Sequence, residues 1–145
     1  MVGERPAFGQ GPGTFYSKLG DYYRPGDGSY RPPHENAHNY FVQAAAETGL
    51  LGLAGFLWIV ASNLIAGFTR VSEEERLRAR LLAIGIVGYL ITAFTGHPLI
   101  LSEQAFLFWG SLGILAACAR LGQAASNVSS VTSHEASASG PSSLE

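Results

Sequence analysis

The longest apolar stretch in the chain covers residues 50–68, LLGLAGFLWIVASNLIAGF, and contains no charged side chain in nineteen residues. Wound as an α-helix, this stretch would measure ~28 Å, close to the ~30 Å hydrocarbon thickness of a bilayer. Helices of soluble proteins are usually shorter, with a mean of about 12 residues. The pattern therefore predicts a first membrane-spanning helix over about 50–68.

Two further apolar runs follow the first. Residues 81–96 would form a helix of ~24 Å, slightly short for a span, and Arg78 and Arg80 at its start can lengthen it by extending their stems along the lipid. The run 99–119 contains Glu103 and Gln104 near its beginning, and these two side chains suit the membrane interface. We expect a second span over about 81–96 and a third over about 103–119.

The segments on either side of the predicted spans are polar. Residues 1–33 are rich in Gly, Pro and Tyr, which predicts an irregular loop. A helix-compatible stretch follows from about residue 34 to residue 48, and Gly49 is the expected break before the first span. Residues 122–145 are rich in Ser, Ala and Gly, which predicts a disordered tail. The predicted fold class is therefore an all-α integral membrane protein with an outer loop over 1–48, three transmembrane helices within 49–121 and a tail over 122–145.

The composition supports a membrane location. Hydrophobic residues make up 47% of the chain and charged residues only 14%, whereas soluble domains carry about a quarter charged residues. The formal net charge of −2 argues against nucleic acid as a partner. The single cysteine, Cys118, lies in an apolar run, and one cysteine cannot form an internal disulfide.

The distribution of arginine predicts the orientation of the spans. The short segment 70–80 carries four arginines, whereas residues 95–104 contain no Lys or Arg. The positive-inside rule then places segment 70–80 and the C-terminus in the cytoplasm, and the N-terminal loop and the turn at His97 outside. The first ten residues form no apolar signal that would carry this loop across a membrane. We therefore expect the chain to be the end of a longer membrane protein, with further helices upstream.

Glycines recur at close helical spacing within the predicted spans, and such small residues allow helices to approach closely in lipid. Glycine is also simply common in membrane helices, so this interpretation stays open. The pairs are Gly52 and Gly55, Gly85 and Gly88, and Gly110 and Gly113.

The sequence HENAH at residues 34–38 matches the zinc-protease pattern H-E-x-x-H. In that interpretation His34 and His38 bind the metal from one helix face and Glu35 acts as the base. Zinc needs a third protein ligand, and the downstream sequence offers no obvious one. His97 would reach the site only through the tertiary fold.

Four groups of residues follow one another between Pro6 and Leu53. They are Pro6; Gly9-Gln10-Gly11-Pro12-Gly13-Thr14-Phe15; Ala37-His38-Asn39; and Glu47-Thr48-Gly49-Leu50-Leu51-Gly52. This ordered set resembles the large outer loop and following span of the O-antigen ligase and O-antigen polymerase family of bacterial envelope glycosyltransferases. The short basic loop and two closing helices are also similar, so that the resemblance covers roughly residues 5–120.

The resemblance implies a reaction at the outer face of the bacterial inner membrane. A glycan on a polyprenyl diphosphate is transferred to a hydroxyl of an acceptor glycan or glycolipid, with no cofactor. Such transfer needs a base to take the hydroxyl proton and cations to hold the departing diphosphate. Histidine suits the first task and arginine the second. We expect His38 to be the general base with Asn39 as its orienting neighbour, and Arg5, Arg24 and Arg31 to be the candidate phosphate ligands.

Glu47 also belongs to the matched residues and is a candidate substrate-binding residue. On one continuous helix it would lie about 900° from His38, on the opposite face. It can partner His38 only if Gly49 breaks the helix and the chain turns. The alternative is a structural role near the N-terminus of the first span, where negative charge is favoured.

Three classes of function therefore stay open. The first is a metal-independent glycosyltransferase, whose partners are the lipid-linked donor, the acceptor and the bilayer. The second is a zinc hydrolase with His34, His38 and Glu35 at its metal site. The third is a small three-span membrane protein without catalysis.

Overall fold

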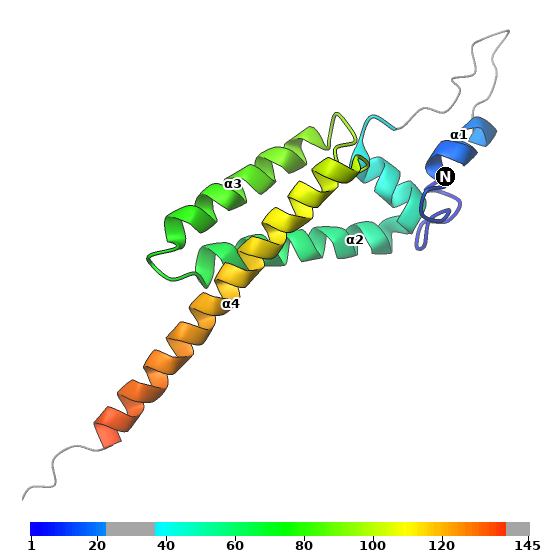
Figure 1. Ribbon diagram of the computed structural model, residues 1–145. Coiled ribbons are helices and arrows are strands. Elements are labelled where there is room, and N and C mark those ends of the chain that lie inside the picture. Colours follow the sequence, from blue (N-terminus) through cyan, green and yellow to red (C-terminus); the bar gives the residue numbers. More distant parts are fainter. Residues whose placement is uncertain (23–36, 139–145) are drawn as a thin grey trace, which may run out of the picture.

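The computed structural model describes residues 1–22 and 37–138, and within them every regular element is a helix (Figure 1). This confirms the all-helical part of the predicted fold class. A short helix lies near the N-terminus, and three longer helices pack against one another. The four elements are α1 (Phe15–Tyr22), α2 (Tyr40–Thr69), α3 (Arg76–Thr92) and α4 (Ser102–Ala138).

Helix α2 consists of two helical segments joined at Gly49, as the sequence predicts. The backbone of Gly49 has φ 72° and ψ 179°, a region that is accessible essentially only to glycine. The long apolar segment begins after Gly49, at Leu50, where the sequence predicts the start of the first span. The sharp change of direction is visible where the cyan part of α2 meets the teal part in Figure 1.

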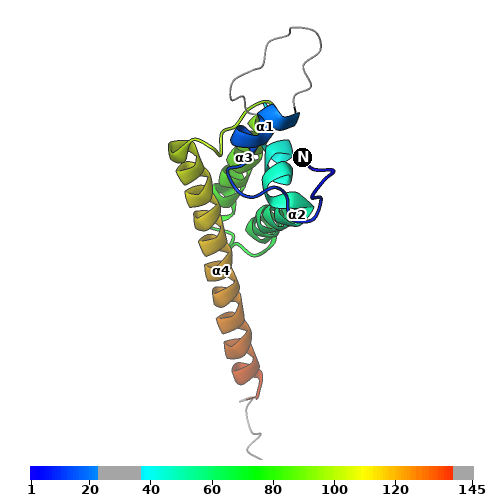
Figure 2. The same cartoon turned by 90° about the vertical axis from the view of Figure 1, so that its right-hand side faces the viewer.

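Helices α2, α3 and α4 share one apolar core. Figures 1 and 2 show that α3 lies along α2, and that α4 crosses α2 and runs away from the turn that joins it to α3. The helices α2 and α3 are joined by a turn in which Glu73 pairs with Arg76 at 2.6 Å. The residues of the buried core are Val60, Val71, Ala79, Ala83, Ile86, Phe108, Leu112, Leu115 and Ala119.

Close contacts between helices occur at glycines other than the predicted pairs. A Cβ on Gly67 would overlap the Leu115 side chain, and a Cβ on Gly122 would overlap the Arg70 carbonyl. Both contacts lie where α4 crosses the C-terminal end of α2. By contrast, a Cβ on five of the six paired glycines would meet nothing within 4 Å, and Gly52 faces only Thr48 of its own helix. The close-packing interpretation of those pairs is therefore wrong for contacts within this chain.

Two helices are long and apolar enough to cross a membrane, namely α2 and the Ser102–His134 part of α4. In their most apolar windows only 11% and 22% of the residues are buried. The central helix of a soluble core would instead be mostly buried, so these exposed apolar surfaces suit lipid or further helices. Helix α3, with 17 residues, is not one of these two candidates.

Four sets of boundaries differ from the sequence prediction. Helix α3 covers Arg76–Thr92, although the second span is expected over about 81–96. Helix α1 lies in a region that was expected to be irregular, and α2 begins at Tyr40 although helix is expected from about residue 34. Helix α4 runs on to Ala138, where a disordered tail is expected from residue 122. The extension has a local reason, since Ala124 and Ala125 favour propagation of a helix that the packed core has already nucleated.

Candidate functional site

The polar segments that carry the candidate residues gather at one end of the helices. The start of α2 lies beside the turn between α3 and α4, and the N-terminal loop lies against the kink of α2 (Figures 1 and 2). Backbone hydrogen bonds fix both contacts. The Tyr40 N–H donates to the Ala93 carbonyl at 2.9 Å, and the Leu50 N–H donates to the Pro6 carbonyl at 2.8 Å.

His38 lies two residues before the first residue of α2, exposed to solvent and accessible to a substrate. Its φ of 49° is in the left-handed region, which is uncommon for a residue with a side chain. Its backbone N–H donates to Nε2 of His97 at 2.8 Å, and the centroids of the two rings are 5.8 Å apart. We call this pair the histidine contact.

Asn39 is the N-cap of α2. Its side-chain oxygen accepts a hydrogen bond from the Val42 N–H at 3.1 Å, which satisfies one of the free donors at the helix start. The amide side chain is thus engaged with the helix rather than with the His38 ring. By fixing the residue at which α2 begins, Asn39 fixes the place of its neighbour His38 along the chain.

The sequence assigns His97 no role beyond that of a zinc ligand that only the tertiary fold could bring to the site. Because its Nε2 accepts the His38 N–H, its ring proton lies on Nδ1. Nδ1 is itself buried and has no hydrogen-bond partner among the described residues. Desolvation by burial lowers the pKa of His97 below its ordinary value, and the nearby His38 lowers this pKa further. Both effects favour the neutral ring that the contact requires. The sequence contains one indication that the two histidines could meet, which is the prediction that both face the same side of the membrane.

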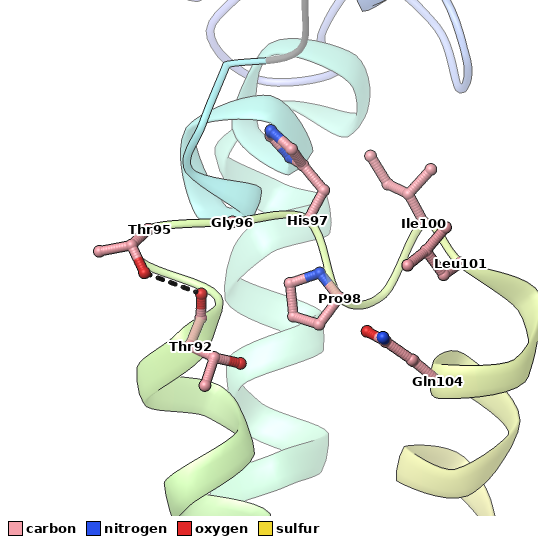
Figure 3. A pocket seen from close by; sticks show the side chains of 8 residues that line it. All are labelled: Thr92, Thr95, Gly96, His97, Pro98, Ile100, Leu101 and Gln104. Carbon is pink, nitrogen blue, oxygen red and sulfur yellow. Dashed lines mark hydrogen bonds between the residues drawn. The ribbon is translucent and has the colours of Figure 1, made fainter.

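A hollow of about 560 Å³ lies beside the histidine contact, between the end of α3 and the start of α4. In Figure 3 the His97 ring points toward the start of α2, whereas Pro98 and Gln104 lie on the other side of the turn. Hydroxyl, amide and aliphatic groups all border this space, a mixture that suits a polar ligand with apolar faces such as a sugar. The lining residues are Thr92, Thr95, Gly96, His97, Pro98, Ile100, Leu101 and Gln104.

Glu47 binds the start of α1. Its carboxylate oxygens accept the backbone N–H groups of Gly13 at 2.9 Å and of Phe15 at 3.2 Å. The side-chain amide of Gln43 also donates to Glu47 at 3.3 Å. A negative charge at the N-terminus of a helix satisfies free donors and interacts favourably with the helix dipole. The carboxylate therefore caps the start of α1, and no described interaction links it to His38.

The N-terminal loop and the kink of α2 fit together through their backbones. Gln10 and Gly11 donate their N–H groups to the carbonyls of Ala46 and Glu47, both at 2.9 Å. Gly9 and Gly49 are buried at this contact, and a Cβ on either would overlap backbone of the other segment. We call this contact between residues 6–15 and 46–51 the loop–kink junction. It brings together three of the four groups of residues that carry the family resemblance.

Of the three candidate phosphate ligands, only Arg5 is described. It is exposed, and its carbonyl accepts the Gly9 N–H at 2.9 Å. No interaction joins Arg5 to His38 in the described parts of the chain. Arg24 and Arg31 lie outside the described residues.

The zinc interpretation depends on residues of which two, His34 and Glu35, lie outside the described segments. The third, His38, precedes α2 and has a left-handed backbone. A helix face shared with position 34 therefore does not extend to His38. Within residues 1–22 and 37–138, no group of three or more His, Cys, Asp or Glu side chains is placed to hold a metal ion.

Comparisons with protein-family models, with curated proteins and with solved structures find no match for this chain. The function must therefore be inferred from the residues and their geometry.

Proposed function

We propose that this chain carries the general base of a membrane glycosyltransferase that resembles the O-antigen ligases and polymerases. The observation that carries the proposal is the position of His38. Its exposed side chain lies just before a long apolar helix, and the hollow of about 560 Å³ lies beside its partner His97. A base at this position can reach a substrate whose lipid lies in the membrane and whose sugar lies in water.

The proposed reaction is the transfer of a glycan from a lipid carrier to an acceptor hydroxyl. An acceptor hydroxyl attacks the anomeric carbon of the sugar that is linked to polyprenyl diphosphate. His38 takes the hydroxyl proton as the new glycosidic bond forms, and the bond between that carbon and the diphosphate oxygen breaks. The diphosphate leaves with the bonding electrons, and nearby cations stabilise its charge. Arg5, Arg24 and Arg31 are the candidates for that task in this chain.

The resemblance gains support from the loop–kink junction. The residues of the ordered set are distant in sequence, yet the Gly9 group, Glu47 and Gly49 form one contact. Matching residues that serve one structural purpose are less easily explained by chance than scattered matches. In this proposal the junction holds the outer loop against the membrane helix that follows His38.

The proposed topology has three spans in the bacterial inner membrane. Helices α2, α3 and α4 cross it, with the N-terminal loop and the histidine contact outside and the turn at Glu73 inside. Helix α3 lies along two helices that are long enough to cross, and Arg78 and Arg80 can extend to the interface at its cytoplasmic end. The two polar ends of the bundle are then on opposite sides of the bilayer.

A single substitution tests the proposed chemistry. In cells that make the protein from its own chromosomal locus, His38→Ala should abolish glycan attachment to the acceptor, measured by electrophoresis and mass spectrometry. His134→Ala, on the exposed end of α4, is the matched control and should leave attachment unchanged. Full attachment in His38→Ala cells, at normal protein level, would remove His38 from the role of base.

Cysteine labelling tests the proposed topology separately. In a Cys118→Ala background, Ser17→Cys should react in intact cells with a maleimide that cannot cross membranes. Ser72→Cys, in the turn between α2 and α3, should react only after the cells are opened. Labelling of position 72 but not of position 17 in intact cells would reverse the orientation and end the proposal, because the glycan substrate is outside.

A further inference from the structure

The His38 backbone is held by a side chain that is distant in sequence. The acceptor is Nε2 of His97, 59 residues away, at 2.8 Å from the His38 nitrogen. A second hydrogen bond joins the start of α2 to the end of α3, because the Tyr40 N–H donates to the Ala93 carbonyl at 2.9 Å. Residues 38–40 are therefore attached to the end of α3 and to the following turn by two hydrogen bonds.

The conformation at His38 needs such a contact. A left-handed backbone at a residue with a side chain is unfavourable and persists only where surrounding contacts determine it. The φ of 49° at His38 is in this region. The bond to His97 is made by the N–H of the strained residue itself, so that it acts directly on the angle that sets the direction of the His38 side chain.

We propose that His97 is a positioning residue for His38, in which the Nε2 lone pair holds the His38 N–H and thereby sets the direction in which the proposed base points. This inference depends on the proposed function for its catalytic consequence. The contact itself is a property of the fold and can be tested without any activity.

The surroundings of His97 are consistent with this role. Its Nδ1 has no described partner, so nothing competes to turn the ring. Hydroxyls at the end of α3 are already engaged, with the Thr92 hydroxyl donating to the Tyr89 carbonyl at 2.7 Å and that of Thr95 to the Thr92 carbonyl at 3.4 Å. On α4, Gln104 is uncharged and Glu103 borders a separate hollow with Phe106 and Leu107. Of the described groups, His38 itself acts electrostatically on His97.

The test compares two substitutions at the same position. His97→Ala removes the acceptor, whereas the side-chain oxygen of His97→Gln lies near the position of Nε2 and can still accept. Amide exchange at His38, measured by NMR on the full chain in lipid nanodiscs, should accelerate roughly tenfold in His97→Ala and return near the wild-type rate in His97→Gln. Circular dichroism of each variant checks that the helices are intact.

Activity provides the second measurement. In glycan-transfer assays with a lipid-linked donor, His97→Ala should lower kcat with little change in KM, and His97→Gln should restore most of kcat. A general structural defect would not be rescued by the hydrogen-bond acceptor that His97→Gln supplies. The nitrogen shifts of the His97 ring should also show the proton on Nδ1.

Three results would overturn the inference: unchanged exchange at His38 in His97→Ala, a His97→Gln variant as impaired as His97→Ala, or a ring proton on Nε2. Failure of the proposed function is distinguishable from these. If the proposed function is wrong but the contact is real, His38→Ala will transfer glycan normally, and His97→Ala will still accelerate amide exchange at His38.

Discussion

The loop–kink junction and the histidine contact both fasten a polar segment to the helices, but they are built differently. The junction uses backbone groups of Gly9, Gln10 and Gly11 against backbone of the α2 kink, with a half-buried carboxylate from Glu47. The histidine contact uses one imidazole, and the histidine it holds is exposed.

The two contacts should therefore affect different properties of the protein. A junction of backbone groups depends on shape, and no side-chain rotation can release it. A contact through one imidazole depends on the protonation state of that ring. We therefore expect substitutions at the junction to change folding, and changes at the histidine contact to change local geometry with little effect on global stability.

The largest effect is expected at the kink itself. Gly49→Ala places a methyl group against the Ala7 backbone and forces a side chain into a region that only glycine adopts readily. Together these should destabilise the protein by roughly 3 kcal/mol or more, measured by thermal unfolding in detergent micelles. Gly55→Ala in the same helix, which meets nothing within 4 Å, is the control and should change stability little. Equal stability of both variants would contradict the close approach.

A smaller effect is expected when the carboxylate at the junction is made neutral. Glu47→Gln leaves one oxygen where two accept the N–H groups of Gly13 and Phe15. The loss should be about 2 kcal/mol, confined to α1, because hydrogen bonds to charged groups are the stronger ones. Hydrogen exchange over residues 13–22 should accelerate while exchange in α3 stays the same. Glu74→Gln, at an exposed site, is the comparison, and uniform acceleration along the chain would argue against a local cap.

On the other side of the comparison, Asn39→Ala removes the N-cap of α2. The first turn of α2 should lose about 1 kcal/mol of stability, since the Val42 N–H loses its acceptor. Asn39→Asp keeps an oxygen at that position and should retain the cap. Exchange at Val42 measures both variants, and identical rates in Asn39→Ala and wild type would exclude the cap.

The smallest effect is expected from pH. The folded pKa of His97 is lowered, so the neutral ring and its bond to His38 are fully present above the ordinary pKa of about 6.5 and are lost as pH falls through the lowered value. Exchange at His38, corrected for its intrinsic pH dependence, should therefore accelerate severalfold toward acid. His97→Gln should give a flat corrected profile, and a profile that stays flat in the wild type would contradict the proposed protonation state.

Local features of the fold follow from the sequence, and long-range pairings do not. The apolar run 50–68 predicts the longer segment of α2, and Gly49 predicts its kink. Helix α1 is not predictable from residues 15–22, because the carboxylate at its N-terminus comes from Glu47, more than 30 residues away. The same reason applies to the glycines, since only the crossing of α2 and α4 determines that Gly67 and Gly122 are the close contacts.

The candidate site shows the same division. The order of the motifs selects His38. The cap at Asn39 does not follow from a prediction that begins the helix at about residue 34, although Asn is a favoured N-cap residue. The proposed role of His97 depends on two segments that meet only in the folded protein. Sequence spacing between these histidines carries no periodicity that would pair them.

Helix α4 has 37 residues, which at 1.5 Å per residue corresponds to ~55 Å, nearly twice the ~30 Å hydrocarbon depth of a bilayer. If its apolar half crosses the membrane, a rod of roughly 25 Å projects into the aqueous phase beyond it. In the proposed topology, that rod leaves the bilayer on the face opposite His38, so its length sets how far the end of α4 extends from the membrane surface.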